Sequence, residues 1–232
     1  MEPTNHVRPD LIDTDAMSRV RGVIFDVDGT LYDQRSLRRR MAVRLARAYW
    51  FKPAQGIRIL RALEAYRQAH EELRELPFSS RLQFDLAVKK CGHPATEVQA
   101  IVDRWFKSAP LAILPHCVYP GVLELLPLLR GLDVACGVFS DYPPDEKLSA
   151  MGLSDFFTCL RCAEDVGRQK PDPAGLLDVA QAMGLVPDEV LYIGDRDIDM
   201  EAATRAGMHG SLVRSNDDWQ SLCVSFKSRG RS

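Results

Sequence analysis

The chain has no long, uninterrupted apolar run. Its most hydrophobic stretches are short, as in 122–129, where Glu124 and Pro127 intervene. A membrane-spanning helix needs roughly 20 consecutive apolar residues, and residues 1–19 also lack the apolar segment of a secretory signal. We therefore expect a cytoplasmic protein with no membrane partner.

An excess of charge of one sign is also absent. The formal net charge is -2 over 232 residues, which gives no global electrostatic reason to expect a nucleic-acid partner. With 46% hydrophobic and 27% charged residues, the composition is that of a globular protein that can bury a substantial core.

The six cysteines lack the spacing of a complete metal site. Cys159 and Cys162 are separated by two residues, which is the spacing of half a zinc site. No second pair with that spacing and no nearby histidine complete the four ligands. Cys136 and Cys159 fall in apolar, strand-like runs, where a free cysteine packs as a small hydrophobic residue. We therefore expect reduced, structural cysteines.

The sequence does contain an alternation of short β-branched runs with segments of helical period. This alternation is typical of a parallel sheet with helices on both faces. The fold class we predict is α/β, with a doubly wound, Rossmann-like core. The predicted strands are 22–26, 134–140, 157–162, 190–194 and 210–213, and the predicted core helices are 122–129, 145–151, 173–183 and 199–206.

One connection breaks this pattern. Between Leu31 and Tyr119 the sequence shows only Arg-rich and Leu/Ala-rich stretches with helical spacing, and this segment is too long for a loop. We predict an all-helical cap domain at 34–118, with helices near 35–51, 55–75, 79–91 and 95–107. The catalytic core is then discontinuous, 20–33 and 119–224, and we expect 1–19 to be flexible and 225–232 to be loosely ordered.

The two predicted modules differ in charge. Residues 34–118 contain 16 Lys and Arg against 7 Asp and Glu, whereas the remainder contains 14 against 25. The arginines could simply coat solvated helix faces. The alternative is that the cap attracts an anionic substrate.

The first predicted strand ends in two carboxylates. Asp26 and Asp28 emerge where the apolar run stops, and Gly29 permits a sharp turn there. Ligands of open α/β sheets bind at such strand ends. Because acidic residues are also common in turns and helix caps, this pair alone is weak evidence for function.

Further polar residues lie at the ends of other predicted strands or in the segments that connect them. Ser140 could bind a phosphoryl oxygen or serve only a turn. Lys170 stands in Lys-Pro-Asp-Pro, where the prolines stiffen the backbone and could fix its ammonium as a point charge. Asp195 and Asp199 follow the fourth predicted strand, and such carboxylates bind Mg²⁺, although Asp199 could instead cap the next helix.

In order and spacing, these elements resemble the motifs of the haloacid dehalogenase superfamily. The resemblance covers about residues 21–213 and implies a hydrolase of the phosphatase branch, with a helical cap inserted after the first motif. It further implies a Mg²⁺-dependent phosphohydrolase that acts on a small phosphorylated metabolite through an aspartyl-phosphate intermediate. The matching residues are Asp26-x-Asp28-Gly29-Thr30-Leu31, Ser140, Lys170-Pro171-Asp172-Pro173, and Gly194-Asp195 followed by Asp199.

The resemblance assigns a role to each of these positions. Asp26 is the implied nucleophile, and Asp28 is the implied acid that protonates the leaving oxygen and then activates water. Ser140 and Lys170 are implied to bind the transferred phosphoryl group. The implied Mg²⁺ ligands are Asp26, the backbone carbonyl of Asp28 and Asp195, with Asp199 beside the metal or orienting Lys170, and Gly29 and Thr30 are candidate substrate-binding residues.

Some positions depart from the common family pattern. Asp141 follows Ser140 where Asn is usual, and Arg196 with Asp197 follows Asp195 where small or polar residues often stand. We count Asp141 among the candidate substrate-binding residues. Its carboxylate would repel an anionic substrate unless the side chain turns away or pairs with a cap arginine.

The residues that select the substrate are expected on the cap. Arg35, Arg38 and Arg39 follow the first hinge and could reach a second anionic group, such as a carboxylate or a sugar phosphate. The five histidines lie outside the motifs, and we interpret them as structural or exposed.

Two alternative functions share this fold. A sugar phosphomutase would use the same core and return the phosphoryl group to a sugar. A catalytically idle binding or regulatory protein is also compatible, since fold does not fix function. A dehalogenase is disfavoured because it attacks carbon and does not need Asp28 as an acid for a phosphate leaving group.

Overall fold

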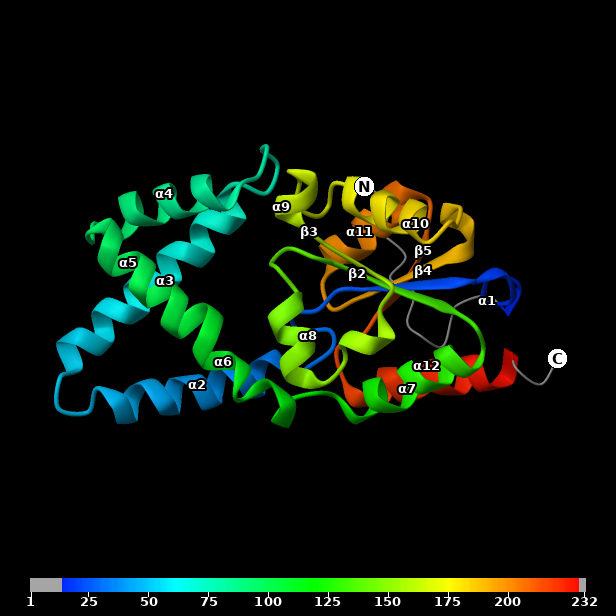
Figure 1. The fold of residues 1–232 in the computed structure, drawn as a ribbon, viewed down its shortest axis with the longest axis horizontal. Coiled ribbons are helices and arrows are strands. Elements are labelled where there is room, and N and C mark those ends of the chain that lie inside the picture. Colours follow the sequence, from blue (N-terminus) through cyan, green and yellow to red (C-terminus); the bar gives the residue numbers. More distant parts are fainter. Residues whose placement is uncertain (1–13, 230–232) are drawn as a thin grey trace.

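A computed structural model describes residues 14–229, in which five parallel strands form one sheet with helices on both faces (Figure 1). The strand order is β3-β2-β1-β4-β5, and every neighbouring pair is parallel. The predicted α/β, doubly wound fold class is confirmed. The strands are β1 (Gly22–Phe25), β2 (Ala135–Ser140), β3 (Cys159–Cys162), β4 (Val190–Gly194) and β5 (His209–Leu212).

Two apolar layers cover the sheet. Alternate side chains of a strand point to opposite faces, so Phe25 packs in the layer with α7 (Pro120–Gly131) and α12 (Asn216–Arg229). Ile24 packs in the opposite layer with α10 (Ala174–Ala182) and α11 (Asp197–Ala206). Burial on both faces explains why β1 is an unbroken apolar run and not an alternating one.

The cap consists of helices between β1 and α7, and it lies at one end of the core (Figure 1). Its own apolar cluster joins residues of different helices, including Leu45, Ile59 and Trp105. The cap elements are α2 (Gln34–Ala48), α3 (Pro53–Glu72), α4 (Ser80–Cys91), α5 (Ala95–Ile101), a π-helix (Val102–Ser108) and α6 (Ala109–Leu111).

The chain enters and leaves the cap through two adjacent hinge segments. The backbone N–H of Asp33 donates to the carbonyl of Cys117 at 2.9 Å, and that of Tyr119 donates to the carbonyl of Leu31 at 3.2 Å. These bonds hold the two crossings side by side, so the cap is joined to the core directly beyond Asp28.

The remaining elements are short. They connect the strands or lead into the longer helices, and α8 follows β2 on the side of the sheet that faces the cap (Figure 1). They are α1 (Thr14–Arg19), the 3₁₀ helix Leu114–His116, α8 (Asp145–Met151), the 3₁₀ helix Ser154–Phe156, α9 (Ala163–Val166) and the 3₁₀ helix Pro187–Glu189.

The expectation of loose ends was wrong within the described residues. Thr14–Arg19 forms α1, and the side chain of Met17 is buried in the core. Residues 225–229 belong to α12, where Phe226 is completely buried. In both cases a few apolar side chains fix a segment that is polar on average. Residues 1–13 lie outside the described part of the chain.

Two further expectations concern the whole chain. The six cysteines are free thiols, and five of them are buried. Among residues 14–229, no helix combines the length and the apolar character that crossing a bilayer requires.

Candidate active site

The polar residues predicted from the strand ends meet at one edge of the sheet. Asp26 follows β1, Ser140 ends β2 and Asp195 follows β4, and β1 lies between the other two strands. From β1 the chain runs outward to β2 and β3 and then crosses to β4 on the other side of β1. The strand order thus reverses next to β1, and the crevice at such a switch point is where open α/β sheets bind ligands.

A cavity of about 440 Å³ opens between this edge and the cap. Asp26, Asp28 and Asp141 line it from the core, and Arg38 and Arg67 line it from the cap. Its volume lies within the range of small-molecule sites.

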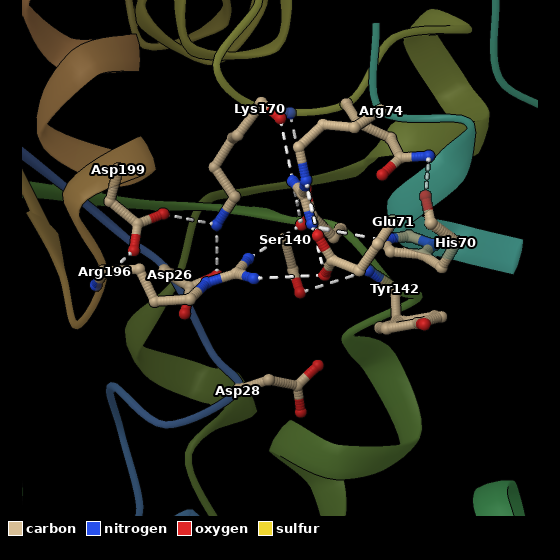
Figure 2. Close-up of polar contacts among 12 residues, drawn as sticks. Asp26, Asp28, His70, Glu71, Arg74, Ser140, Tyr142, Lys170, Arg196 and Asp199 are labelled. Atoms are coloured by element: carbon tan, nitrogen blue, oxygen red, sulfur yellow. Dashed lines mark hydrogen bonds and ion pairs between the residues drawn. The ribbon is translucent and has the colours of Figure 1, made fainter. Parts of the chain in front are cut away.

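The ammonium of Lys170 occupies the centre of the polar cluster (Figure 2). Its Nζ lies 2.6 Å from Oδ1 of Asp26, 2.7 Å from Oδ1 of Asp199 and 3.2 Å from the hydroxyl of Tyr192. Burial disfavours the charged form, but the carboxylates of Asp199 and Asp26 outweigh it and hold the pKa of Lys170 well above its ordinary value. Lys170 is therefore a fixed, fully buried positive charge.

Asp26 is almost completely buried, and both of its oxygens accept hydrogen bonds. Oδ1 accepts from Lys170, and Oδ2 accepts from the hydroxyl of Thr30 at 2.9 Å. Burial raises the pKa of Asp26 to about 7, with Asp199 and Asp195 adding to the rise and Lys170 opposing it. Burial and Asp199 likewise raise the pKa of Asp195 to about 6. One ammonium does not compensate three clustered carboxylates.

These carboxylates fit a hard divalent cation. Asp26, Asp195 and Asp199 each offer an oxygen, and the three oxygens lie within 4.8 Å of one another. Carboxylate oxygens are the ligands that Mg²⁺ prefers, and two positive charges would balance the two negative charges that Lys170 leaves uncompensated. The donor set of this cluster is therefore suited to the predicted Mg²⁺.

Asp199 differs from the other two carboxylates. Its Oδ1 contacts Lys170, and its Oδ2 accepts a 2.9 Å bond from the backbone N–H of Arg196 at the start of α11. Both oxygens are thus already bound. Of the two predicted roles for Asp199, the geometry favours orienting Lys170. Asp199 also binds the start of α11, but as the third residue of the helix and not as the N-cap that we had considered.

Gly29 and Thr30 lie next to the carboxylates of Asp195 and Asp26. Gly29 has a φ of +101°, and a Cβ at this position would lie 2.4 Å from Oδ2 of Asp195, so both the turn and the close approach require glycine. Thr30 is fully buried and hydrogen-bonds to Asp26. Neither residue is part of the cavity lining, and their predicted contact with substrate stays a prediction.

Asp28 stands apart from the Lys170 cluster in Figure 2 and faces the cavity. Nζ of Lys147, on α8, donates to its two oxygens at 2.7 and 2.5 Å, and the hydroxyl of Tyr32 donates to Oδ1. Burial opposes ionisation, but Lys147 and Tyr32 outweigh it and hold the pKa of Asp28 below its ordinary value. Asp26 and Asp28 thus occupy environments that shift their pKa values in opposite directions.

Asp141 is buried beside Ser140 and faces several cations. Arg74 of the cap and Arg196 of the core donate to its Oδ2 at 3.2 and 2.9 Å, and Nε2 of His70 lies 3.6 Å from the same oxygen. The pKa of Asp141 is well below its ordinary value, because Lys170 and these neighbours outweigh the effect of burial. Pairing with a cap arginine, one of the two alternatives we had considered, is observed.

Comparison with known families shows which family the chain belongs to. The family model of haloacid dehalogenase-like hydrolases matches residues 20–207, which include Asp26, Asp28, Ser140, Lys170 and Asp195. The chain belongs to the haloacid dehalogenase-like hydrolases. This confirms the resemblance inferred from the motifs.

Curated relatives of this hydrolase are phosphatases. A glyceraldehyde 3-phosphate phosphatase of Methanopyrus kandleri is 30% identical over 203 residues, covering 84% of each chain. A phosphoglycolate phosphatase of Shigella boydii is 27% identical over 207 residues, covering 81% of this chain and 79% of the relative.

Solved structures share the fold at lower identity. A 2-haloacid dehalogenase from Pseudomonas syringae is 22% identical, with a TM-score of 0.60 and coverage of 91% of this chain and 99% of that one. A β-phosphoglucomutase from Clostridium difficile is 14% identical, with a TM-score of 0.56 and coverage of 92% and 100%. These two structures support the fold alone.

In this hydrolase, the three predicted cap arginines differ in position. All three are exposed, but only Arg38 lines the cavity, and Arg35 and Arg39 lie outside its lining. The reason is helical geometry: positions 34, 37, 38 and 41 of α2 face the cavity, and positions 35 and 39, one turn apart, lie on another face.

The sequence did not single out several residues of the site. Lys147, Tyr32, Arg67 and Arg74 carry no local pattern that distinguishes them from surface residues, and Lys147 and Asp28 are 119 positions apart. His70 was interpreted as structural or exposed. It is buried, stacks on Tyr142 with ring centroids 4.3 Å apart and lines the cavity.

Proposed function

We propose that this haloacid dehalogenase-like hydrolase is a Mg²⁺-dependent phosphomonoesterase that acts on a small phosphorylated metabolite through an aspartyl-phosphate on Asp26. The observation that carries the proposal is a pair of carboxylates in unlike environments on one cavity wall. Asp26 lies between Lys170 and Thr30, and Asp28 faces the open cavity. The curated phosphatase relatives support a small phosphorylated substrate.

The proposed reaction has two steps. A carboxylate oxygen of Asp26 attacks phosphorus, the bond to the leaving oxygen breaks, and Asp28 gives that oxygen a proton. Asp28 then takes a proton from water, whose oxygen attacks phosphorus and releases inorganic phosphate and the Asp26 carboxylate. Because Lys147 and Tyr32 favour the ionised form of Asp28, its acid role requires that bound substrate takes over part of these contacts.

The neighbours of the carboxylates stabilise the transferred group. The ammonium of Lys170 is held by Asp26 and Asp199 and offsets negative charge on the phosphoryl oxygens, which Ser140 also binds. When bound, Mg²⁺ would offset further charge on Asp26 and the phosphoryl group. Asp26, Asp195 and the backbone carbonyl of Asp28 would hold it.

Phosphate release from a panel of substrates tests this proposal. The panel contains sugar phosphates, nucleoside monophosphates, phosphoglycolate and an aryl phosphate, each with Mg²⁺ or with EDTA. We expect Mg²⁺-dependent release by the wild type and background release by Asp26→Asn. Acid-quenched protein should retain covalent ³²P from a labelled substrate only when Asp26 is present.

The control and the product separate this function from the alternatives. Asp145→Asn makes the same chemical change at an exposed position of α8 and should retain full activity. Conversion of a sugar phosphate to its isomer without net phosphate release would indicate a mutase. Absence of both turnover and covalent label in folded wild type with Mg²⁺ would contradict the proposal and indicate a binding protein.

A further inference from the structure

Two arginines of the cap line the cavity, and their guanidinium groups form no hydrogen bond or ion pair with the described residues. Arg38 on α2 and Arg67 on α3 both line it. Within residues 14–229 neither side chain takes part in a hydrogen bond or an ion pair, and the one ring contact is Arg67 over Phe106 at 5.9 Å. Arg58, on another face of α3, instead binds Glu97 through two bonds of 3.0 and 2.7 Å.

The carboxylates of the cavity are already paired with other cations. Asp28 is bound by Lys147, Asp141 by Arg74 and Arg196, and Glu71 also by Arg74. Asp26, the remaining acidic residue of the described cavity wall, contacts Lys170. None of these four carboxylates forms an ion pair with Arg38 or Arg67.

The two guanidinium groups also act on each other. Partial desolvation at the cavity wall lowers the pKa of Arg67, and the positive charge of Arg38 lowers it further. An anion placed between them would reverse this repulsion, and carboxylate and phosphate groups match the donor geometry of guanidinium.

The position of the pair relative to Asp28 defines which part of a substrate it would meet. Asp26, Asp28 and the two arginines line the same cavity, the aspartates from the core and the arginines from cap helices α2 and α3. A substrate with its phosphorus at Asp26 and its leaving oxygen at Asp28 would therefore present its remote end to the cap side, where Arg38 and Arg67 lie.

We infer that Arg38 and Arg67 form a recognition site for a second anionic group, a carboxylate or a phosphate, at the end of the substrate remote from the transferred phosphoryl group. This inference rests on the proposed phosphatase function and adds a substrate class to it. The preferred substrates are short phosphomonoesters that carry this second negative charge.

Substrates with the same two-carbon chain but different groups at the far end test the inference. Phosphoglycolate carries a carboxylate where 2-hydroxyethyl phosphate carries a neutral hydroxymethyl group, and ethylene glycol bisphosphate carries a phosphate at the far end. For whichever anionic substrate the wild type prefers, we expect Arg38→Ala and Arg67→Ala each to lower kcat/KM by about tenfold to a hundredfold. The value for 2-hydroxyethyl phosphate should change less than about threefold, because that substrate makes no such contact.

Two exposed arginines on the same helices provide the controls. All four side chains are exposed, but Arg40 on α2 and Arg61 on α3 lie outside the cavity lining, whereas Arg38 and Arg67 belong to it. Arg40→Ala and Arg61→Ala should therefore leave both kcat/KM values unchanged. The inference is wrong if Arg38→Ala and Arg67→Ala affect anionic and neutral substrates alike, or affect neither. Unchanged thermal unfolding of the variants would exclude a loss of fold as the cause.

A binding measurement separates this inference from the proposed function. Calorimetry of phosphoglycolate and ethylene glycol bisphosphate on Asp26→Asn, with the two arginine variants added to that background, requires no turnover. Weaker binding by about tenfold or more with each arginine variant supports the site even if the wild type releases no phosphate. Equal affinity in all three proteins, or no detectable binding of either anion, overturns it even if phosphate is released.

Discussion

Hydrogen-bond donors from three parts of the chain surround the carboxylate of Asp141. Arg74 comes from the cap, Arg196 from the loop after β4, and the backbone N–H of Lys170 donates to Oδ1 at 3.4 Å. Arg74 also donates to the carbonyl oxygen of Lys170 at 2.8 Å. Because Asp141 is only 6% exposed, its charge is stable only while these partners remain.

Asp141 should make the stability of the fold pH-dependent. Its folded pKa lies well below the ordinary value, so its contribution is complete above the unfolded pKa of about 3.9 and is lost as the pH falls towards the folded pKa. We expect Asp141→Asn to unfold at lower urea concentration than the wild type at pH 7. The gap should shrink between about pH 4 and pH 3, and a constant gap would contradict this assignment.

The partner of Asp141 on the cap allows a matched comparison at pH 7. Arg74→Ala leaves a buried carboxylate with fewer partners and should lower the free energy of unfolding by about 3 kcal/mol. Arg81→Ala removes a 90% exposed arginine whose nearest carboxylate, in Asp85, is 3.9 Å away, and it should change stability by less than about 1 kcal/mol. Similar losses for the two variants would indicate that Asp141 does not depend on Arg74.

At the level of elements, α12 completes one face of the sheet. It packs along α7, and Trp219 stacks on Phe25 of β1 with ring centroids 6.3 Å apart and an interplanar angle of 13°. Its buried side chains, Trp219, Leu222, Cys223 and Phe226, follow the spacing of a helix face. Because Phe25 directly precedes Asp26, the packing of this helix supports the strand that positions the nucleophile.

Truncation of one aromatic side chain tests this support. Phe226 is fully buried, so Phe226→Ala should lower the free energy of unfolding by about 3 to 5 kcal/mol in urea denaturation. Val224 lies on the same helix and is 62% exposed, so Val224→Ala should cost less than about 0.5 kcal/mol. A small effect of Phe226→Ala would mean that α12 is dispensable for the fold.

Strands and helices that are marked by a local pattern of apolar residues could be predicted from the sequence. The strands were found because each is a short apolar run beside a turn, and 190–194 was placed at the bounds the structure shows. The polar residues at the strand ends followed directly from that placement. The spacing of Trp219, Leu222 and Phe226 also carried a helical signal that we did not use, so α12 was missed.

Contacts between distant segments could not be predicted in this way. Arg74 and Asp141 are 67 positions apart and Lys147 and Asp28 are 119 apart, and their pairing depends on how the cap sits against the core. From the sequence we could only list pairing of Asp141 with a cap arginine as one of two alternatives, and no particular arginine was singled out. Arg38 and Arg39 lie on different faces of α2, but the sequence does not show which face of that helix lines the cavity.

At the scale of the whole molecule, opposite charges meet across the cavity. The segment 34–118 carries 16 Lys and Arg against 7 Asp and Glu, and the rest of the chain carries 14 against 25. Some of these charges pair across the boundary, as Arg74 of the cap does with Asp141 of the core, and one pair, Glu71 of the cap with Arg196 of the core, has the opposite polarity. The unpaired cap arginines at the cavity remain available to attract an anion past the acidic core.

This arrangement predicts that substrate capture weakens with salt. Raising NaCl from about 20 mM to about 500 mM shortens the screening length from roughly 20 Å to roughly 4 Å, so kcat/KM for a phosphorylated substrate should fall severalfold while kcat stays nearly constant. Steady-state kinetics at fixed Mg²⁺, with thermal unfolding measured in the same buffers, would check this. A rise in kcat/KM with salt would show that repulsion by the acidic core outweighs attraction by the cap, and an equal fall in kcat would show that salt acts on the chemical step and not on capture.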